Sequence, residues 1–347
     1  MRCNFLAAIF LTAVLILCSC QRRELVDVGN THYVRVYVDE HIKNVTEGFY
    51  NVDNARPNYK TPQILHVTLA DPKTGEVRAD RYLRNQGDDE RGHYYDGYII
   101  CEPGVWNLLA WNFDAEETQI SSTGNQFASK AYTDEIAYYL KGRLPSRYSK
   151  AGEITDEKIV YDPDHLFVAS CGNVRIPYTS DIDTLRTPEG EWFRAESIVE
   201  SWYIQIRVKG MQYVSSSVSL LTGMAAGKWL WNKEMDPSDV TLFFEMSKSG
   251  EASKSDDETV IYSTFSTFGK LPQAQNELEL TFDFVMSYGT HSETFNVTDE
   301  FYTENALNHR WIILDKVIEI PAPSKGEGGG FAPGIDKWDD IHSDLII

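Results

Sequence analysis

The alternation of side chains along this chain is clearest in Trp202-Tyr203-Ile204-Gln205-Ile206-Arg207-Val208-Lys209. The even-numbered residues of this stretch are large and apolar, and the odd-numbered residues carry polar or charged groups. Successive side chains of a strand point to opposite faces of a sheet, so a period of two predicts a strand with one buried face. This stretch therefore favours an all-β fold.

The same period recurs on both sides of this stretch. Further strands are predicted in the C-terminal half over 240–246, 260–268, 277–284, 295–298 and 310–320. In the N-terminal half they are predicted over 33–38, 64–69, 98–101, 106–113, 166–170 and 174–178. Asp71-Pro72-Lys73-Thr74-Gly75 reads as a hairpin turn, because proline presets φ and glycine supplies a positive φ. One helix is expected from Thr133 to Lys141, since Ile136, Tyr139 and Leu140 share a face there.

A mostly polar stretch from Thr179 to Glu196 interrupts the alternation and predicts a domain boundary. With 347 residues the chain is long enough for two domains. We expect two antiparallel β-sandwiches in tandem, an N-terminal one over 32–180 and a C-terminal one over 195–323.

The composition excludes several classes of protein. The chain has 52 acidic and 32 basic side chains, a net charge of −20, so it repels phosphate backbones and we expect no nucleic-acid partner. Hydrophobic residues make up 42%, which is typical of a packed globular protein and argues against wholesale disorder.

The first nineteen residues predict a signal peptide. Arg2 is followed by an apolar run from Phe5 to Leu17, which is too short to span a hydrocarbon core of about 30 Å as a helix. The run ends in Leu17-Cys18-Ser19-Cys20, which resembles the lipobox of bacterial lipoproteins. The resemblance implies cleavage before Cys20, acylation of that cysteine with chains such as palmitate, and a lipidated tether over 20–31. An ordinary secretory signal is the alternative.

The residues after Cys20 bear on where the chain is sorted. Gln21 rather than an aspartate follows the cysteine, which fits an outer membrane, while the exposed face of that membrane stays open. The pair Arg22-Arg23 is interpreted either as a solvated tether or as a cleavage site for a trypsin-like protease that would free the protein.

Two cysteines fall in the folded part, Cys101 and Cys171. Both lie in or beside predicted strands, so they are either a disulfide pair or, as we favour, buried free thiols.

The tail differs from the rest of the chain. A glycine-rich hinge begins at Ser324, within a tail region spanning 324–347, and an imperfect amphipathic strand follows. Its apolar residues share one parity: Phe331, Ile335, Ile341, Leu345 and Ile347. A tethered amphipathic strand is suited to joining the sheet edge of a partner, although it can also pack on its own domain.

Several short motifs along the chain occur together in a known family. They are Cys20-Gln21-Arg22-Arg23-Glu24-Leu25, Leu221-Thr222-Gly223-Met224-Ala225, Phe265-Ser266-Thr267-Phe268-Gly269, Phe295-Asn296-Val297-Thr298-Asp299, and Gly328-Gly329-Gly330-Phe331 with Trp338-Asp339-Asp340. In this order the chain resembles the fimbrillin-type lipoproteins of the Bacteroidetes, and within them the fimbrial anchor-like subgroup.

The resemblance implies two transthyretin-like β-sandwich domains, attachment to the outer membrane, and a role as anchor or accessory subunit of a fimbrium in cell adhesion. The expected partners are fimbrial subunits, joined by strand exchange. Cys20 alone carries over as a functional residue. Shaft subunits of this superfamily are cut after a basic residue in a loop beyond their first strand, and no clear equivalent is present, which favours an anchor or tip role.

Motifs of enzymes and metal sites were sought as well. The chain has no His-Glu-x-x-His, no Gly-x-Ser-x-Gly and no glycine-rich phosphate loop, so we expect no enzyme and no cofactor. Asp162, Asp164 and His165 form the nearest approach to a metal cluster, but such a composition is common in loops and no metal site is predicted. Asp88-Asp89-Glu90 is interpreted as a solvated acidic loop.

The alternative function is a surface glycan-binding lipoprotein of a polysaccharide-uptake system. Stacking platforms for sugars would come from Trp106, Trp111, Trp202, Trp229, Trp231 and Trp311. Trp229 and Trp231 are the best candidates for exposure, whereas Trp202 is in phase with the core face of its predicted strand.

Overall fold

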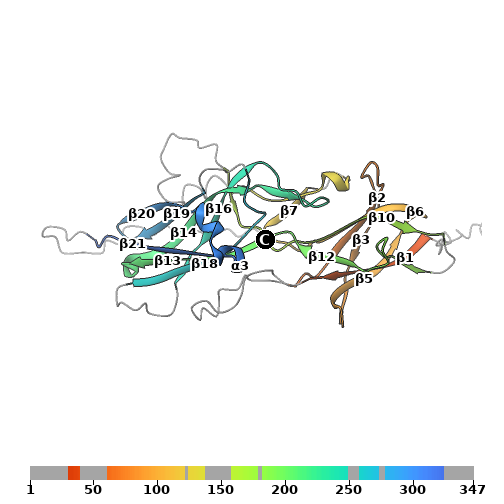
Figure 1. Ribbon diagram of the computed structural model, residues 1–347, viewed down its shortest axis with the longest axis horizontal. Helices are drawn as coiled ribbons and strands as arrows, with labels where there is room; N and C mark the ends of the chain where they lie inside the picture. Colours follow the sequence, from red (N-terminus) through yellow and green to blue (C-terminus); the bar gives the residue numbers. More distant parts are fainter. Residues whose placement is uncertain are drawn as a thin grey trace, which may run out of the picture.

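A computed structural model describes residues 30–39, 61–121, 124–136, 158–178, 182–248, 258–272 and 278–323. These residues form an elongated, nearly all-β molecule with two strand-rich modules placed end to end (Figure 1). The predicted fold class, two β-sandwiches in tandem, is confirmed. Within the described part of the chain, no helix is long and apolar enough to cross a membrane. Cys20 and the tail 324–347 lie outside the described residues.

The first module is a single sheet of nine strands that folds over on itself. Its order is β3-β2-β6-β10-β12-β1-β5-β4, with β11 paired to β1 off this path. The strands are β1 (Thr31–Val38), β2 (Leu65–Ala70), β3 (Val77–Leu83), β4 (Asn85–Asp89), β5 (Gly92–Ile100), β6 (Gly104–Asn112), β10 (Phe167–Ile176), β11 (Asp183–Thr184) and β12 (Phe193–Ser197). The two halves of the sheet enclose one core, in which Val36 of β1 packs with Leu65, Leu108 and Phe167.

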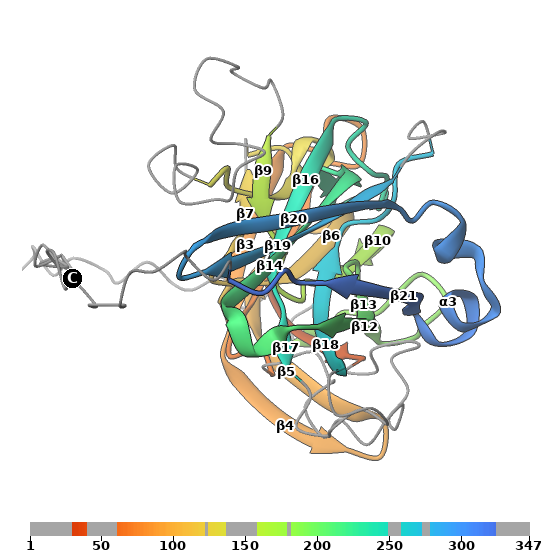
Figure 2. The same cartoon turned by 90° about the vertical axis from the view of Figure 1, so that its left-hand side faces the viewer.

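The second module is a sandwich of two sheets, seen as two layers in Figure 2. One layer has the order β17-β18-β13-β21 and the other β20-β19-β14-β16-β9. Its strands are β9 (Ile159–Tyr161), β13 (Glu200–Lys209), β14 (Val214–Ala225), β16 (Asp239–Glu245), β17 (Ser247–Lys248), β18 (Glu258–Thr267), β19 (Glu279–Met286), β20 (Gly289–Asn296) and β21 (Trp311–Glu319). Phe244 and Phe265 stack between the layers with their ring centroids 4.5 Å apart.

The quoted stretch 202–209 forms β13, and its even-numbered residues lie in this core as predicted. Trp202, Ile204, Ile206 and Val208 are at most 4% exposed. The other face of β13 is less open than the alternation suggests. Gln205 is also buried, and its side chain accepts a hydrogen bond of 2.9 Å from the Tyr203 hydroxyl.

A third, small sheet joins the two modules. Strands β7 (Thr118–Ser121) and β8 (Lys130–Thr133) come from the N-terminal half, and β15 (Gly227–Trp229) comes from the C-terminal half. A Cβ atom at Gly227 would collide with the Ala131 carbonyl oxygen, so only glycine allows β15 and β8 to lie this close. A separate apolar cluster, containing Trp111, Val168 and Phe268, fills the junction.

The strand pairing therefore interleaves the two halves of the chain. Strand β9 pairs with β16 of the second module, and β11 and β12, within the stretch expected to be a polar boundary, pair with β1 of the first. Because β12 ends at Ser197 and β13 begins at Glu200, we place the crossing between modules there. The limits 32–180 and 195–323 remain a proposal.

Most neighbouring strands are antiparallel, but β1 with β11 and β12, β13 with β21, and β9 with β16 are parallel. Parallel neighbours need a long crossover connection, which a reading of local turn signals does not reveal.

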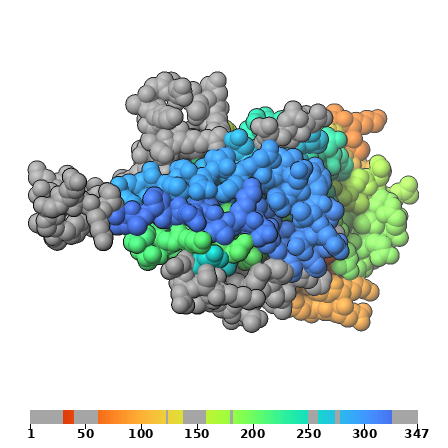
Figure 3. Space-filling view, turned by 60° about the vertical axis from the view of Figure 1, so that its left-hand side comes forward, coloured from red at the N-terminus to blue at the C-terminus, as the bar shows by residue number. Residues whose placement is uncertain are grey.

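Helical structure is minor. The helix expected from Thr133 to Lys141 is not formed at its start, because Thr133 ends β8 and Glu135 makes a β-bridge with Val160; residues 137–141 lie outside the described part. The structure instead has α3 (Glu304–His309), whose first turn is capped by the Thr303 hydroxyl accepting from Ala306 N. Short 3₁₀ turns are η2 (Gln126–Ala128), η3 (Met211–Tyr213) and η4 (Asp299–Tyr302). In the space-filling view β20, β21 and α3 lie on the surface of the second module (Figure 3).

Candidate assembly site

The first strand of the chain occupies a central place in the first module. Strand β1 pairs antiparallel with β5 along seven residues, from Thr31 opposite Ile100 to Tyr37 opposite Tyr94. Its other edge pairs in parallel with β11 and then β12, where Val36 lies opposite Phe193. Both edges of β1 are thus hydrogen-bonded, and removing the strand would expose the edges of β5 and β12.

The inner face of β1 anchors it in the core. Val34, Val36 and Val38 are at most 4% exposed. At roughly 1.5–3 kcal/mol for each fully buried aliphatic side chain, this stripe is a large apolar contribution for so short a strand.

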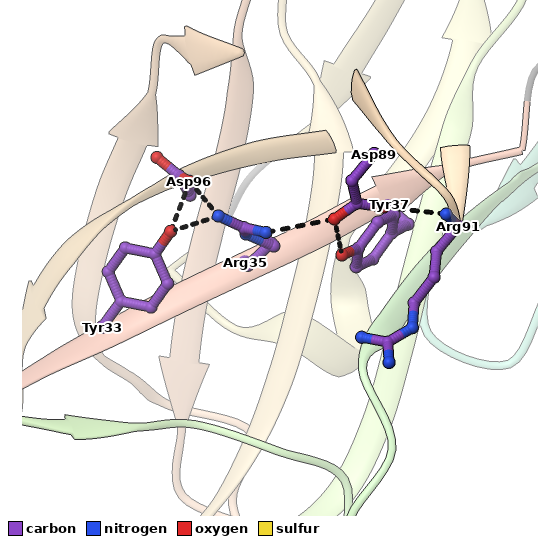
Figure 4. Close-up of polar contacts among 6 residues, drawn as sticks. All are labelled: Tyr33, Arg35, Tyr37, Asp89, Arg91 and Asp96. Carbon is purple, nitrogen blue, oxygen red and sulfur yellow. Dashed lines mark hydrogen bonds and ion pairs between the residues drawn. The ribbon is translucent and has the colours of Figure 1, made fainter. Parts of the chain in front are cut away.

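The outer face of β1 carries a polar network, which we call the clamp and define as Tyr33, Arg35, Tyr37, Asp89 and Asp96 (Figure 4). The Arg35 guanidinium donates to Asp96 Oδ2 at 3.0 Å and to Asp89 Oδ2 at 3.3 Å. Asp89 Oδ2 also accepts from the Tyr37 hydroxyl at 2.7 Å, and Asp96 accepts from the Tyr33 hydroxyl. The clamp thereby links β1 to β5 and to the end of β4.

Aromatic rings complete the cover over the clamp. The Arg35 guanidinium carbon lies 3.7 Å from the centroid of the Tyr94 ring, a cation–π contact. The Trp192 ring packs edge-on against Tyr37, with centroids 5.8 Å apart. As a result Tyr37 is fully buried although it lies on the outer face of its sheet.

The environment of the clamp shifts the pKa of two of its residues, Tyr33 and Asp89. Burial, together with the neighbouring Asp96 carboxylate, raises the pKa of Tyr33 to about 12, so this hydroxyl keeps its proton and stays a donor. Hydrogen bonds from the Tyr37 hydroxyl and from Arg91 N lower the pKa of Asp89, so its carboxylate stays ionised. Both shifts preserve the donor–acceptor pairing at neutral pH.

The second polar region lies at the junction and contains Asp162, Asp164 and His165. A cavity of about 700 Å³ lies against these residues. Asp164 Oδ2 accepts from three backbone amides, those of Glu116, Glu117 and Thr118, at 2.6–3.1 Å.

The other two residues of this motif turn to other partners. Asp162 Oδ2 accepts from Ser266 N at 3.2 Å, and His165 Nε2 lies 3.2 Å from Ser201 Oγ. Burial raises the pKa of Asp162 to about 6 and lowers that of His165. The three side chains brace segments on either side of the junction, and within the described residues no group of three His, Cys, Asp or Glu side chains could hold a metal ion.

The remaining predicted candidates have separate places in the structure. Cys101 and Cys171 are free thiols, and burial raises the pKa of Cys101 to about 11. Trp111 and Trp202 are buried, and no tryptophan of the described part counts among the exposed large side chains. Trp231 packs on the junction core, with its ring centroid 5.5 Å from that of Phe127. The lipidation residue Cys20 and the strand residues Phe331, Ile335, Ile341, Leu345 and Ile347 lie outside the described residues.

The clamp was not found by reading the sequence. Tyr33, Arg35 and Tyr37 were assigned only to a strand, and Asp89 to a solvated loop. The available signal was an arginine flanked by two tyrosines on one face of an otherwise valine-rich strand, which needs acceptors on its neighbours.

Comparison with known proteins gives this architecture a family. The sequence model of a domain of unknown function, DUF5119, matches residues 19–245, which is more than half of the chain, so the chain belongs to this family. Over 95% of its length it is 22% identical to a Bacteroides ovatus protein named "Putative fimbrium anchoring subunit Fim4B", of which 94% is covered.

Two solved structures are similar to this chain, and one of them supports the fold. A crystal structure of a "putative adhesin" from Bacteroides ovatus ATCC 8483 superposes with a TM-score of 0.55 at 19% identity, covering 88% of this chain and 98% of that one. The fimbrial anchor protein Mfa2 from Porphyromonas gingivalis matches with a TM-score of 0.45 at 11% identity, covering 82% and 88% of the two chains. The family model and the similarity to the protein named as a fimbrium anchoring subunit confirm the resemblance to fimbrial anchor-like proteins.

Proposed function

We propose that this member of the DUF5119 family is a non-enzymatic anchor or accessory subunit of a fimbrium, held in the outer membrane by acyl chains on Cys20. The similarity to a protein named as a fimbrium anchoring subunit, over nearly the full length of both chains, supports this role. The structural observation that carries it is a series of paired strands along the molecule, from β1 through β12 and β13 to β21.

Force on such an anchor enters at one end and leaves at the other. Strand β1 lies at one pole of the long axis, and β21 runs to the opposite pole (Figure 1). Thr31 follows Cys20 by eleven positions, so a membrane attachment would reach β1 through a tether of at most about 40 Å. Residue 324 follows β21 closely, so the proposed tail strand would leave from the other pole.

Two parallel strand pairs connect these poles. Force on β1 passes through its ladder with β12, continues along the chain into β13, and passes through a second parallel ladder to β21. A pull along paired strands loads many hydrogen bonds together, so neither ladder can open one bond at a time. The clamp adds side-chain contacts between β1 and its neighbours on the other edge, β5 and the end of β4.

Strand complementation would then act at the far pole. In the described structure β1 pairs on both edges, so the place between β5 and β12 is already filled and is not open to the strand of another subunit. Residues 331–347, with Phe331, Ile335, Ile341, Leu345 and Ile347 on one face, are instead proposed to add to the sheet of a neighbouring fimbrial subunit. The edge position of β21 in its sheet offers a second surface for such a contact.

The anchoring is tested by labelling cells with a palmitate analogue. Wild type and Cys18→Ala are expected to incorporate label, and Cys20→Ala to lose it and be released from the membrane fraction. Label that persists in Cys20→Ala would refute lipid attachment at this cysteine.

The assembly role is tested by deleting residues 331–347 and measuring co-purification with fimbrial subunits. We expect at least about a tenfold loss, because backbone pairing and apolar burial of the strand are removed together. As a control, the variant Asp336→Asn, Asp344→Asn changes two residues on the polar face of the predicted strand and should co-purify normally. Unchanged assembly by a folded deletion variant would exclude the proposed strand.

A further inference from the structure

Beside the clamp, the first module has a cavity that the assembly role does not use. It has a volume of about 550 Å³ and is lined by Arg91, Arg186, Gly190, Glu191, Trp192 and Arg194. Arg91 lies in the turn between β4 and β5, and the other five lie in β12 and in the segment that leads from β11 to it. In Figure 4 the Arg91 side chain points away from the clamp.

The lining of this cavity is positively charged, whereas the chain as a whole is negatively charged. The sequence carries a net charge of −20, yet three guanidinium groups and a single carboxylate line this space. Within the described residues the ion-paired arginines are Arg35, Arg78, Arg207 and Arg310, none of which belongs to the cavity. Within the part of the chain that the structure describes, none of these three arginines forms an ion pair, although the charge of Glu191 acts on Arg186, so together they form a local site for an anion on a strongly acidic protein.

Aromatic rings contact two of these guanidinium groups, those of Arg186 and Arg194, without using their N–H donors. The Arg186 guanidinium carbon lies 3.0 Å from the centroid of the Trp192 ring, and that of Arg194 lies 5.4 Å from the centroid of Tyr37. Stacking of this kind fixes the plane of a guanidinium and leaves its edge free to bind an oxyanion. Burial lowers the pKa of Arg186, and repulsion from Arg91 lowers it further. A bound anion would offset this repulsion and stabilise the protonated guanidinium.

We propose that this cavity binds the carboxylate of an acidic sugar, such as a uronic acid residue of a glycan. A carboxylate matches the planar fork of an arginine, and Glu191 can accept hydrogen bonds from sugar hydroxyls. The same Glu191 carboxylate repels a dianion, which disfavours phosphate as the ligand. The volume lies within the range of pockets that hold small molecules. This site is independent of the role in fimbrial assembly.

The binding is tested by saturation-transfer NMR on the folded protein with methyl glucuronide as probe and methyl glucoside as its neutral counterpart. We expect transfer to the glucuronide and none to the glucoside. In the double variant Arg91→Gln, Arg194→Gln, both positions being exposed, the affinity should fall at least about tenfold, because two charge-assisted donors are lost. The control Arg78→Gln, Arg175→Gln removes the same charge from exposed positions outside the cavity and should bind like wild type.

Several results would overturn the assignment. They are no transfer to the glucuronide, equal transfer to the glucoside, and unchanged affinity in the Arg91, Arg194 variant. Inorganic sulfate competing with the same affinity as the glucuronide would show a simple anion site. A synthetic peptide of residues 331–347 that binds more tightly than the glucuronide would assign the cavity to the acidic tail.

Discussion

The two modules hold their central strands in different ways. In the second module β13 packs its inner face on stacked phenylalanines between two sheets, while its outer face carries more exposed ion pairs, such as that of Arg207 with Asp315. In the first module β1 is held on both faces, by a valine stripe inside and by the clamp outside. The difference teaches that the polar contacts on the outer face of β1, the strand nearest the proposed membrane tether, are better shielded from solvent than the ion pairs on β13.

The largest expected effect concerns the apolar core of the second module. Phe265→Ala should lower the free energy of unfolding by about 3–5 kcal/mol, because it removes a ring that is 1% exposed and stacked on Phe244. Urea denaturation measures the change. The matched control is Leu307→Ala, whose side chain is 61% exposed and should matter little. A loss below about 1 kcal/mol for Phe265→Ala would contradict the apolar account of this module.

At the junction, we expect the substitution Asp162→Asn to raise the free energy of unfolding by about 2 kcal/mol. Asp162→Asn keeps an acceptor for Ser266 N and removes a buried charge, so the variant should be more stable than wild type at pH 8. The folded pKa of about 6 lies above the value of 3.8 in the unfolded chain. The contribution of Asp162 is therefore fully present below pH 3.8 and is lost as the pH rises through 6.

The pH profile separates this residue from the histidines. Burial lowers the pKa of His32, His66 and His165, and their contribution is present above pH 6.5 and is lost on acidification. Subtracting the unfolding free energy of Asp162→Asn from that of wild type at each pH removes the contribution of the histidines, which both proteins share. If the difference in unfolding free energy between the two proteins does not change between pH 4 and pH 7, burial does not raise the pKa of Asp162.

The smallest of these effects is expected at the clamp. Arg35→Met retains much of the packing on Tyr94 but removes both carboxylate contacts, which should cost about 1–2 kcal/mol because the group is only partly shielded from solvent. Hydrogen exchange should accelerate in β1 and β5 and stay unchanged in β13 and β21. Arg175→Met, at an exposed position of β10, serves as the control. Equal acceleration in both modules would remove the distinction drawn between them.

The strand content of this protein was accessible from its residues, since a period of two depends only on the geometry of a single strand. The turn at Asp71–Gly75 was accessible for the same reason: Gly75 has φ of 73°, and Asp71 Oδ1 accepts from Lys73 N and Thr74 N at 2.8 Å. The short helix α3 was missed because its six residues are too few to show a helical period.

The sequence by itself determined the strands with a clear period of two, such as 202–209, and their apolar face, because both follow from local sterics and side-chain chemistry, whereas β3, β4 and β14 were not predicted. Only the tertiary structure decided which strands are neighbours. Alternation assigns a side chain to a face but carries no information on the partner strand. Arg35 meets Asp89 and Asp96, more than fifty residues away, because β1 lies beside β5 and not beside any other of many similar strands. The clamp and the arginine-lined cavity exist only through that choice of neighbours.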